Sequence, residues 1–244
     1  MRNAVDPRAS SGSMLAALAL ALALAAPAGR ADDAVADLVK RCVDAYGGPA
    51  AVARAAVIRE RGRTTSILHP GAAGRILRVY QRPGRLRVEI AFPGDPPEVR
   101  VLDGGRGWRW GEPSSGPQLV AMILQAARLD LPAMLQAWRA RVSDRGTWQH
   151  EGRALRVLSV PVAPGVEVEA GIDPATGRIL RSRGSGRDAA FPLEFVTTYS
   201  DFRTVDGVLV AFREGNWANG ATTGETVLEK VEIEPEIDAD AFRP

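Results

Sequence analysis

The chain has 244 residues, of which 45% are hydrophobic and 25% are charged, so it can bury a sizeable core and does not have the composition of a disordered protein. Its formal net charge of +2 at pH 7 lacks the basic excess that marks nucleic-acid-binding proteins. Cys42 is the only cysteine, which excludes an internal disulfide. Packing therefore has to stabilise the fold.

The N-terminal segment has the pattern of an export signal. Arginines precede an Ala/Leu run from Met14 to Ala26 that is too short to span a bilayer, and small residues follow it. We expect a signal peptide over residues 1–31, cleaved near Ala28 or Ala31, and a mature protein in the periplasm. A retained anchor is the alternative, and Met1 or Met14 could be the translation start.

Removal of this leader takes away three of the 31 basic and one of the 29 acidic residues, so the mature chain is about neutral. Nucleic acid is therefore not an expected partner.

The first predicted element is a helix. Asp32 and Asp33 favour its start, and the Gly47-Gly48-Pro49 sequence ends it. Its apolar stripe, which includes the thiol that we expect to be buried, consists of Val35, Leu38, Val39, Cys42, Val43 and Tyr46.

After a short helical turn over residues 50–54, extended runs alternate with Gly/Pro turn signals, as in an antiparallel meander. The first run covers residues 57–68, and the run at 85–92 has one clearly apolar side. We expect the next two strands to continue that side, which would consist of Leu86, Val88, Ile90, Phe92, Val99, Val101, Trp108 and Trp110.

Residues 117–142 change to helical spacing, with Asp130-Leu131-Pro132 restarting the helix. This helical insertion is apolar over a wide arc that includes Met122, Ile123, Met134 and Trp138. Its methionines can be core fillers or an adaptable lining for an apolar ligand.

The meander resumes at residues 155–162 and continues in a hairpin over residues 166–181, whose turn is specified by Asp173, Pro174 and Gly177. The basic Gly/Ser-rich stretch at 181–188 is typical of a mobile, solvated loop; a phosphate-binding loop is the less favoured reading because the Walker spacing is missing.

Asp206-Gly207 predicts a two-residue hairpin turn between runs at 195–202 and 208–212. Asn219-Gly220 marks a further turn, a last strand covers 226–233, and Phe242 of the tail is expected to reach the core.

These elements predict an α+β protein, mainly antiparallel β, with residues 32–244 in one domain. About ten strands should form a sheet that curls or closes rather than lying flat.

The sequence offers little for catalysis or metal binding. His69 and His150 are the only histidines, and neither has a metal ligand at a suitable spacing. No nucleophile elbow and no dinucleotide-binding glycine pattern is present. We therefore expect no enzyme activity, no metal and no cofactor.

The order of several segments resembles the bacterial outer-membrane lipoprotein-sorting proteins, the LolA-like family. The segments are a helix ending in Tyr46-Gly47-Gly48, a meander interrupted by helices, the hairpin sequence at 172–180, the sequence from Tyr199 to Val208, and the closing Phe242-Arg243-Pro244. The resemblance implies a strongly curved, open (incomplete) β-barrel around an apolar cavity, with helices as a lid or plug. It also implies a periplasmic carrier that shields the acyl chains of a lipid or lipoprotein.

The ligand-binding residues that we predict are Leu86, Val88, Ile90, Val99, Val101, Trp108, Trp110, Met122, Ile123, Met134 and Trp138. Each tryptophan can equally serve core packing. The expected partners are lipid or lipoprotein acyl chains and envelope membrane proteins, with the protein as a monomer. The alternatives are an interaction module whose own helix fills the cavity, and a hydrolase that uses His69 or His150.

Overall fold

The computed structural model describes residues 28–187 and 192–244. Most of the predicted signal peptide, residues 1–27, lies outside the described residues, as does Asp188 at the end of the predicted loop. The first helix begins at Ala28, one of the two predicted cleavage positions.

Four α-helices and thirteen strands make up the described structure. The helical elements are α1 (Ala28–Ala45), α2 (Gly48–Arg54), α3 (Gly116–Leu129), α4 (Leu131–Ala137) and the 3-10 turn η1 (Arg139–Arg141). The strands before α3 are β1 (Val57–Thr65), β2 (Ala73–Gln81), β3 (Arg85–Ala91), β4 (Glu98–Asp103), β5 (Arg106–Arg109) and β6 (Glu112–Ser114). The strands after α4 are β7 (Ser143–His150), β8 (Arg153–Ala163), β9 (Val166–Ile172), β10 (Ile179–Arg187), β11 (Pro192–Val205), β12 (Val208–Ala218) and β13 (Ala221–Ile233).

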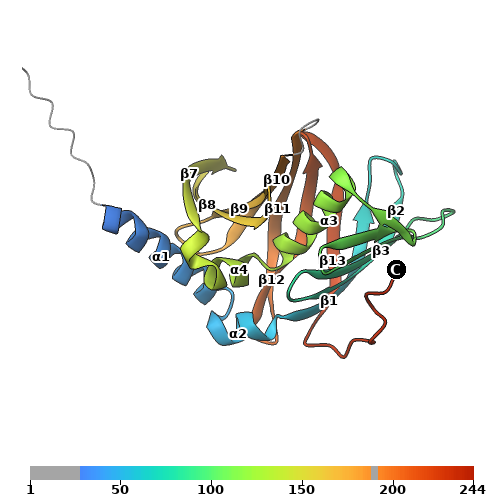
Figure 1. Ribbon diagram of the computed structural model, residues 1–244, viewed down its shortest axis with the longest axis horizontal. Helices are drawn as coiled ribbons and strands as arrows, with labels where there is room; N and C mark the ends of the chain where they lie inside the picture. The colour runs from blue at the N-terminus through green and yellow to red at the C-terminus, as the bar shows by residue number, and fades with distance from the viewer. Residues whose placement is uncertain (1–27, 188–191) are drawn as a thin grey trace, which may run out of the picture.

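All thirteen strands belong to one antiparallel sheet with the order β6-β5-β4-β3-β2-β1-β13-β12-β11-β10-β9-β8-β7. Two meanders are joined at the centre, where β1 pairs with β13. The sheet stays open, with β6 and β7 at its edges, and α3 and α4 connect those two edges along the chain. Figure 1 shows the sheet curving around these helices.

The predicted open antiparallel sheet is thus confirmed, but the expected count of about ten strands is wrong. β6 has only three residues, and most of the side chains of β7 are exposed, so neither shows the alternation of a half-buried strand. β10 was predicted too short, with a loop expected from residue 181 onward.

The predicted loop at 181–188 is wrong, because its first seven residues belong to β10. Side chains of α3 lie directly on this strand: a Cβ on Gly184 would be 2.8 Å from Leu124 Cδ2, and a Cβ on Gly186 would be 2.6 Å from Val120 Cγ1. Glycines are present here because the helix packs against the strand backbone. In this segment, glycines that suggested a turn instead allow the close contact between α3 and β10.

The predicted β9–β10 hairpin is confirmed. The Asp173 carboxylate accepts hydrogen bonds from the Ala175 N–H (2.9 Å) and the Thr176 hydroxyl (2.9 Å). Gly177 has φ +72° and donates its N–H to the Asp173 carbonyl oxygen. A Cβ on Gly177 would also lie 2.5 Å from the Arg41 carbonyl oxygen, so the turn fits closely against α1.

Helices cover the concave face in two regions. Under α1 and α4, residues such as Cys42, Leu135 and Ile172 form a closed core with β8, β9 and β10. The predicted apolar stripe of the first helix packs here, and its thiol is buried. Under α3, Met122 and Ala126 pack on Tyr80, Leu86 and other residues of β2, β3 and β4.

The expectation that three strands share one apolar side is wrong beyond β3. Directly opposite residues of antiparallel strands point to the same face, and the register pairs Leu86 with Leu102 but Arg87 with Val101. Val99, Val101 and Trp108 therefore face the opposite, convex side, because a change of one residue in register exchanges the two faces.

The C-terminal segment covers these residues on the convex side. Phe242 is 4% exposed and packs with Val79 and Val101, as the sequence predicted for the tail. The Arg85 guanidinium lies 4.8 Å from the centre of the Phe242 ring. The tail therefore seals the back of the strands that carry α3.

Over the described ranges, no single helix has both the length and the hydropathy to cross a bilayer; α3 and α4 pass that test only together, with an 82° bend between them.

We predict that Gly184→Val destabilises the protein by about 1–3 kcal/mol, since the added methyl groups would force Leu124 and α3 away from the sheet. Urea denaturation measures the change. Ser185→Val, one residue along the same strand with its side chain on the other face, is the control and should change the free energy of unfolding by less. Equal losses would show that α3 does not rest on this strand.

Candidate ligand cavity

A cavity of about 590 Å³ lies between α3 and the concave face of the sheet. Its walls come from α3 and from β1 to β5 and β9 to β13, together with the loops after β1, β3 and β5. Ligand sites in proteins commonly have about 300–1,000 Å³. The cavity is therefore large enough for one small amphipathic molecule.

The mouth of the cavity carries exposed apolar side chains. Leu68, in the β1–β2 connection, is 80% exposed, and Trp110, in the β5–β6 turn, is 61% exposed, and both line the cavity. Ile67, next to Leu68, is 59% exposed. Large side chains left in water around an opening are typical of surfaces that meet an apolar partner.

A group of cations lies near the mouth. Arg100 and Arg109 both donate to the same oxygen of Glu98, at 2.6 and 2.7 Å, so two cations share one carboxylate. Burial acts to raise the pKa of Glu98, but the hydrogen bonds and charges of Arg100 and Arg109 prevail and lower it. The Arg109 guanidinium also lies 4.1 Å from the centre of the Trp110 ring.

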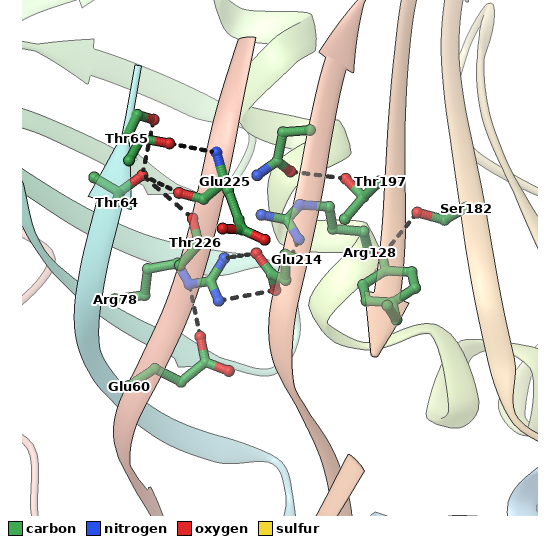
Figure 2. A network of polar contacts seen from close by, with 12 residues as sticks. Glu60, Thr64, Thr65, Arg78, Arg128, Ser182, Thr197, Glu214, Glu225 and Thr226 are labelled. Atoms are coloured by element: carbon green, nitrogen blue, oxygen red, sulfur yellow. Dashed lines mark hydrogen bonds and ion pairs between the residues drawn. The ribbon is translucent and has the colours of Figure 1, made fainter. Parts of the chain in front are cut away.

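The floor of the cavity is charged. Arg78 of β2 is 1% exposed and donates from Nε to Glu60 of β1 (2.6 Å) and from Nη1 and Nη2 to Glu214 of β12 (2.7 and 2.9 Å). Figure 2 shows Arg78 between the two carboxylates. Three strands of the two meanders are thereby joined through one buried guanidinium.

A second arginine reaches the same floor from the opposite wall. Arg128, in the last turn of α3, places Nη1 3.1 Å from Glu214 Oε1. This contact is an ion pair without the geometry of a hydrogen bond, so Nη1 is buried without a hydrogen-bond partner. In Figure 2 the side chains of Arg128 and Arg78 approach Glu214 from opposite sides.

The two carboxylates have pKa values shifted in opposite directions. Burial raises the pKa of Glu60, and Arg78 only partly offsets this effect. Burial acts in the same direction on Glu214, but the charges of Arg128 and Arg78 and the hydrogen bonds of Arg78 lower its pKa from 4.5 to about 2. Glu214 is therefore the firmly ionised partner, and Glu60 is the one that takes up a proton more readily.

Hydroxyl and amide groups surround this charged floor. The Thr64 hydroxyl donates to the Glu225 carbonyl oxygen (3.0 Å), and the Thr197 hydroxyl donates to Asn216 Oδ1 (3.1 Å). The hydroxyls of Ser182 and Tyr199 are 2.7 Å apart. The deep end of the cavity is therefore polar, whereas its mouth combines exposed apolar side chains with the ion pairs of Glu98.

A smaller cavity of about 90 Å³ lies beyond the Arg128–Glu214 pair. Arg128 lines both cavities, whereas Glu214 and Glu60 line the smaller one, together with mainly apolar residues such as Val52, Leu131 and Val210. The ion pair is thus the partition between the two cavities.

The structure separates the eleven predicted ligand-binding residues into four places. Only Ile90 and Trp110 line the larger cavity. Leu86, Val88, Met122 and Ile123 pack against one another in the core between α3 and the sheet. Met134 and Trp138 belong to the core beneath α1 and α4. Val99, Val101 and Trp108 lie on the convex face.

Sequence reasoning missed the polar floor. Arg78 lies between Leu77 and Val79, and Glu60 lies in a run rich in arginine, so both look like residues on a solvated face. Their burial follows from the β1–β13 pairing, which brings together strands from the two ends of the chain. No local signal in the sequence reveals that pairing.

The described part of the chain contains no group of three or more His, Cys, Asp or Glu side chains that could hold a metal ion. His69 lines the mouth, stacks on Phe92 and places Nδ1 3.2 Å from Asp95. The nearby Ser66 hydroxyl oxygen accepts a hydrogen bond from the Leu68 N–H.

Comparisons with known proteins show similarity in structure. No protein family model and no curated protein sequence matches the chain. A LolA superfamily protein from Nitrosomonas europaea is 12% identical, with a TM-score of 0.54 over 85% of this chain and 96% of that one. A DUF1329 family protein from Desulfovibrio piger is 10% identical, with a TM-score of 0.51 over 87% and 97% of the two chains.

The open antiparallel sheet wrapped around helices is thus the fold of a LolA-like protein, as the sequence resemblance predicted.

We predict that Glu214→Gln destabilises the protein more than Glu60→Gln. Removing the charge of Glu214 leaves two buried guanidinium groups with one carboxylate, and breaking a buried pair costs about 3–5 kcal/mol. Glu60 contacts only Arg78, and its raised pKa shows that burial already opposes its charge. Chemical denaturation at pH 7 measures both changes; a larger loss for Glu60→Gln would contradict the assignment.

The pH dependence of stability supplies a separate prediction. A carboxyl group whose pKa falls from 4.5 to about 2 on folding stabilises the protein above pH 4.5 and loses this contribution as the pH falls towards 2. Glu214→Gln should therefore show a shallower loss of stability over that range than the wild type. Denaturation at several acidic pH values, with Glu225→Gln on the exposed side of β13 as the control, measures the difference.

Proposed function

We propose that this protein is a periplasmic binding protein that shelters the acyl chain of an amphipathic lipid or lipoprotein and carries it without making or breaking bonds. The observation that supports this proposal best is the cavity of about 590 Å³ with large apolar side chains exposed at its mouth. The LolA-like fold agrees with it.

The binding energy would come from removing methylene groups from water. Each buried methylene contributes about 0.8 kcal/mol, so ten of them contribute about 8 kcal/mol before the cost of ordering the ligand. Apolar lining residues such as Ile76, Ile90, Phe92, Leu124 and Phe195 are available for these contacts. Such affinity holds a lipid firmly and still permits its transfer.

The remaining elements of the proposal follow from the leader sequence and the resemblance. Export by the predicted signal peptide would place residues 32–244 in the periplasm, where the protein would act as a monomer between envelope membrane proteins. In this scheme α3 and α4, which close the open side of the sheet, form the lid.

The two alternatives are less well supported. An interaction module requires a concave face filled by its own side chains. This holds beneath α1 and α4 and where Met122 packs on β3, but not at the cavity of about 590 Å³. A hydrolase would need a nucleophile beside His69 or His150; the described contacts of the His69 side chain are with Phe92 and Asp95.

Native mass spectrometry of protein purified from the periplasm tests the proposal. We expect a bound species in the mass range of single-chain or two-chain lipids, which is released by organic extraction. Protein that is always ligand-free and that also fails to take up a fluorescent fatty acid would refute the proposal.

We predict that Ala121→Trp abolishes uptake of a fluorescent fatty acid, because Ala121 of α3 lines the cavity and an indole ring would occupy much of its volume. Ala140→Trp, at an exposed position of η1, should bind as the wild type does. Circular dichroism and thermal unfolding verify that both variants fold. Unchanged uptake by a folded Ala121→Trp protein would place the ligand elsewhere.

A further inference from the structure

We infer that the ligand carries a carboxylate head group on a single acyl chain and enters head first, so that its carboxylate binds at Arg128 and its chain points to the mouth. This inference rests on the proposed lipid-binding function and names its ligand class and orientation. It follows from the distribution of charge and apolar surface within the cavity.

Arg128 is the residue of the floor whose guanidinium N–H group lacks a hydrogen-bond acceptor. Both oxygens of Glu214 already accept hydrogen bonds from Arg78. Arg128 therefore approaches Glu214 only as an additional cation, and its buried Nη1 has no hydrogen-bond partner. A buried, charged donor without an acceptor costs free energy. The Arg128 side chain as a whole is 12% exposed and lines the cavity, so a carboxylate that enters can accept hydrogen bonds from its guanidinium group.

The charges around the floor can accommodate one more anion. Glu214 faces two guanidinium groups, and the second carboxylate, Glu60, makes its hydrogen bond to Arg78 alone. Because burial raises the pKa of Glu60, this residue can take up a proton when another negative charge arrives nearby. The pair of arginines would then face Glu214 and the ligand.

The polarity of the cavity sets the orientation of the ligand. The floor contains Arg78, Thr197 and Ser182, all at most 4% exposed. The mouth contains Leu68 and Trp110, the two most exposed large apolar side chains among the residues that the structure describes. A chain placed tail first would bury methylene groups against charged groups, and its carboxylate at the mouth would meet Arg100 and Arg109, which are already paired with Glu98.

Binding of three ligands with the same chain tests the head group. Isothermal titration calorimetry of the wild type should give an affinity for decanoate at least about tenfold higher than for decanol or methyl decanoate, because only the acid forms charge-assisted hydrogen bonds. If all three bind equally, the carrier function stands and the head-group inference is wrong. If none binds, the proposed function fails as well.

Variants of Arg128 locate the carboxylate. Arg128→Gln should lower affinity for decanoate about tenfold or more without weakening decanol binding, because the buried charge that a neutral chain would cover is gone. Arg128→Lys should retain part of the preference through its charge. Arg75→Gln, which removes an exposed charge of β2 outside the cavity, should bind as the wild type does. A preference for decanoate that persists in Arg128→Gln would overturn the assignment. Should Arg128→Gln fail to fold, the affinities of Arg128→Lys for decanoate and decanol, together with those of the wild type for the three ligands, test the assignment.

Labelled ligands test the orientation. An undecanoic acid with a dansyl group at the end of its chain should bind about as well as decanoate, because the label would remain at the mouth. The same label attached through an amide at the carboxyl end should weaken binding at least tenfold. The reverse order would show that the chain enters first and would contradict the inference.

Discussion

The buried ion pairs of Arg78 connect the two halves of this protein. β1 and β2 come from the first meander and β12 from the second, and among the described strands the meanders are joined by the pairing of β1 with β13 alone. Glu60, Arg78 and Glu214 form a crosslink across that junction on the concave face. An ion pair in a low-dielectric interior tolerates little displacement, since a charge without its partner costs several kcal/mol. The curvature of the sheet at its centre is thus tied to the geometry of one guanidinium group.

The same pairs explain why the cavity is not filled. Beneath α1 and α4, apolar side chains from helix and sheet meet directly, and the core there is closed. Beneath the middle of α3, the sheet presents charged and hydroxyl groups, which an apolar helix side chain cannot cover without leaving hydrogen bonds unmade. Gly184 and Gly186 draw α3 onto β10 at one wall, and Met122 holds it on β2, β3 and β4 at the other. Between these two contacts the helix bridges the cavity.

Local sequence patterns were sufficient to predict much of the fold but few of the residues that line the cavity. The first helix, the Asp173 turn, the Asp206-Gly207 turn and the buried Phe242 follow from spacing and turn chemistry within short segments. The faces of β4 and β5 depend on register, which spacing alone does not define, so Val101 and Trp108 were assigned to the wrong side. The glycines of β10 gave a misleading signal because their function is long-range packing. The charged floor requires partners up to 154 positions apart in the chain, from Glu60 to Glu214, and no window of sequence contains both.

A charged floor changes what such a cavity can select. In a wholly apolar cavity, affinity rises with every methylene group, and discrimination between chains with different heads is weak. Here a neutral chain that reached the floor would remove Arg128 from water and leave it without an acceptor, and this loss would offset part of the gain from the chain. The buried arginine therefore affects selectivity mainly by lowering the affinity for ligands that have no hydrogen-bond acceptor for it. Selectivity in this protein would come from the cost of covering Arg128 with something that cannot accept its hydrogen bonds.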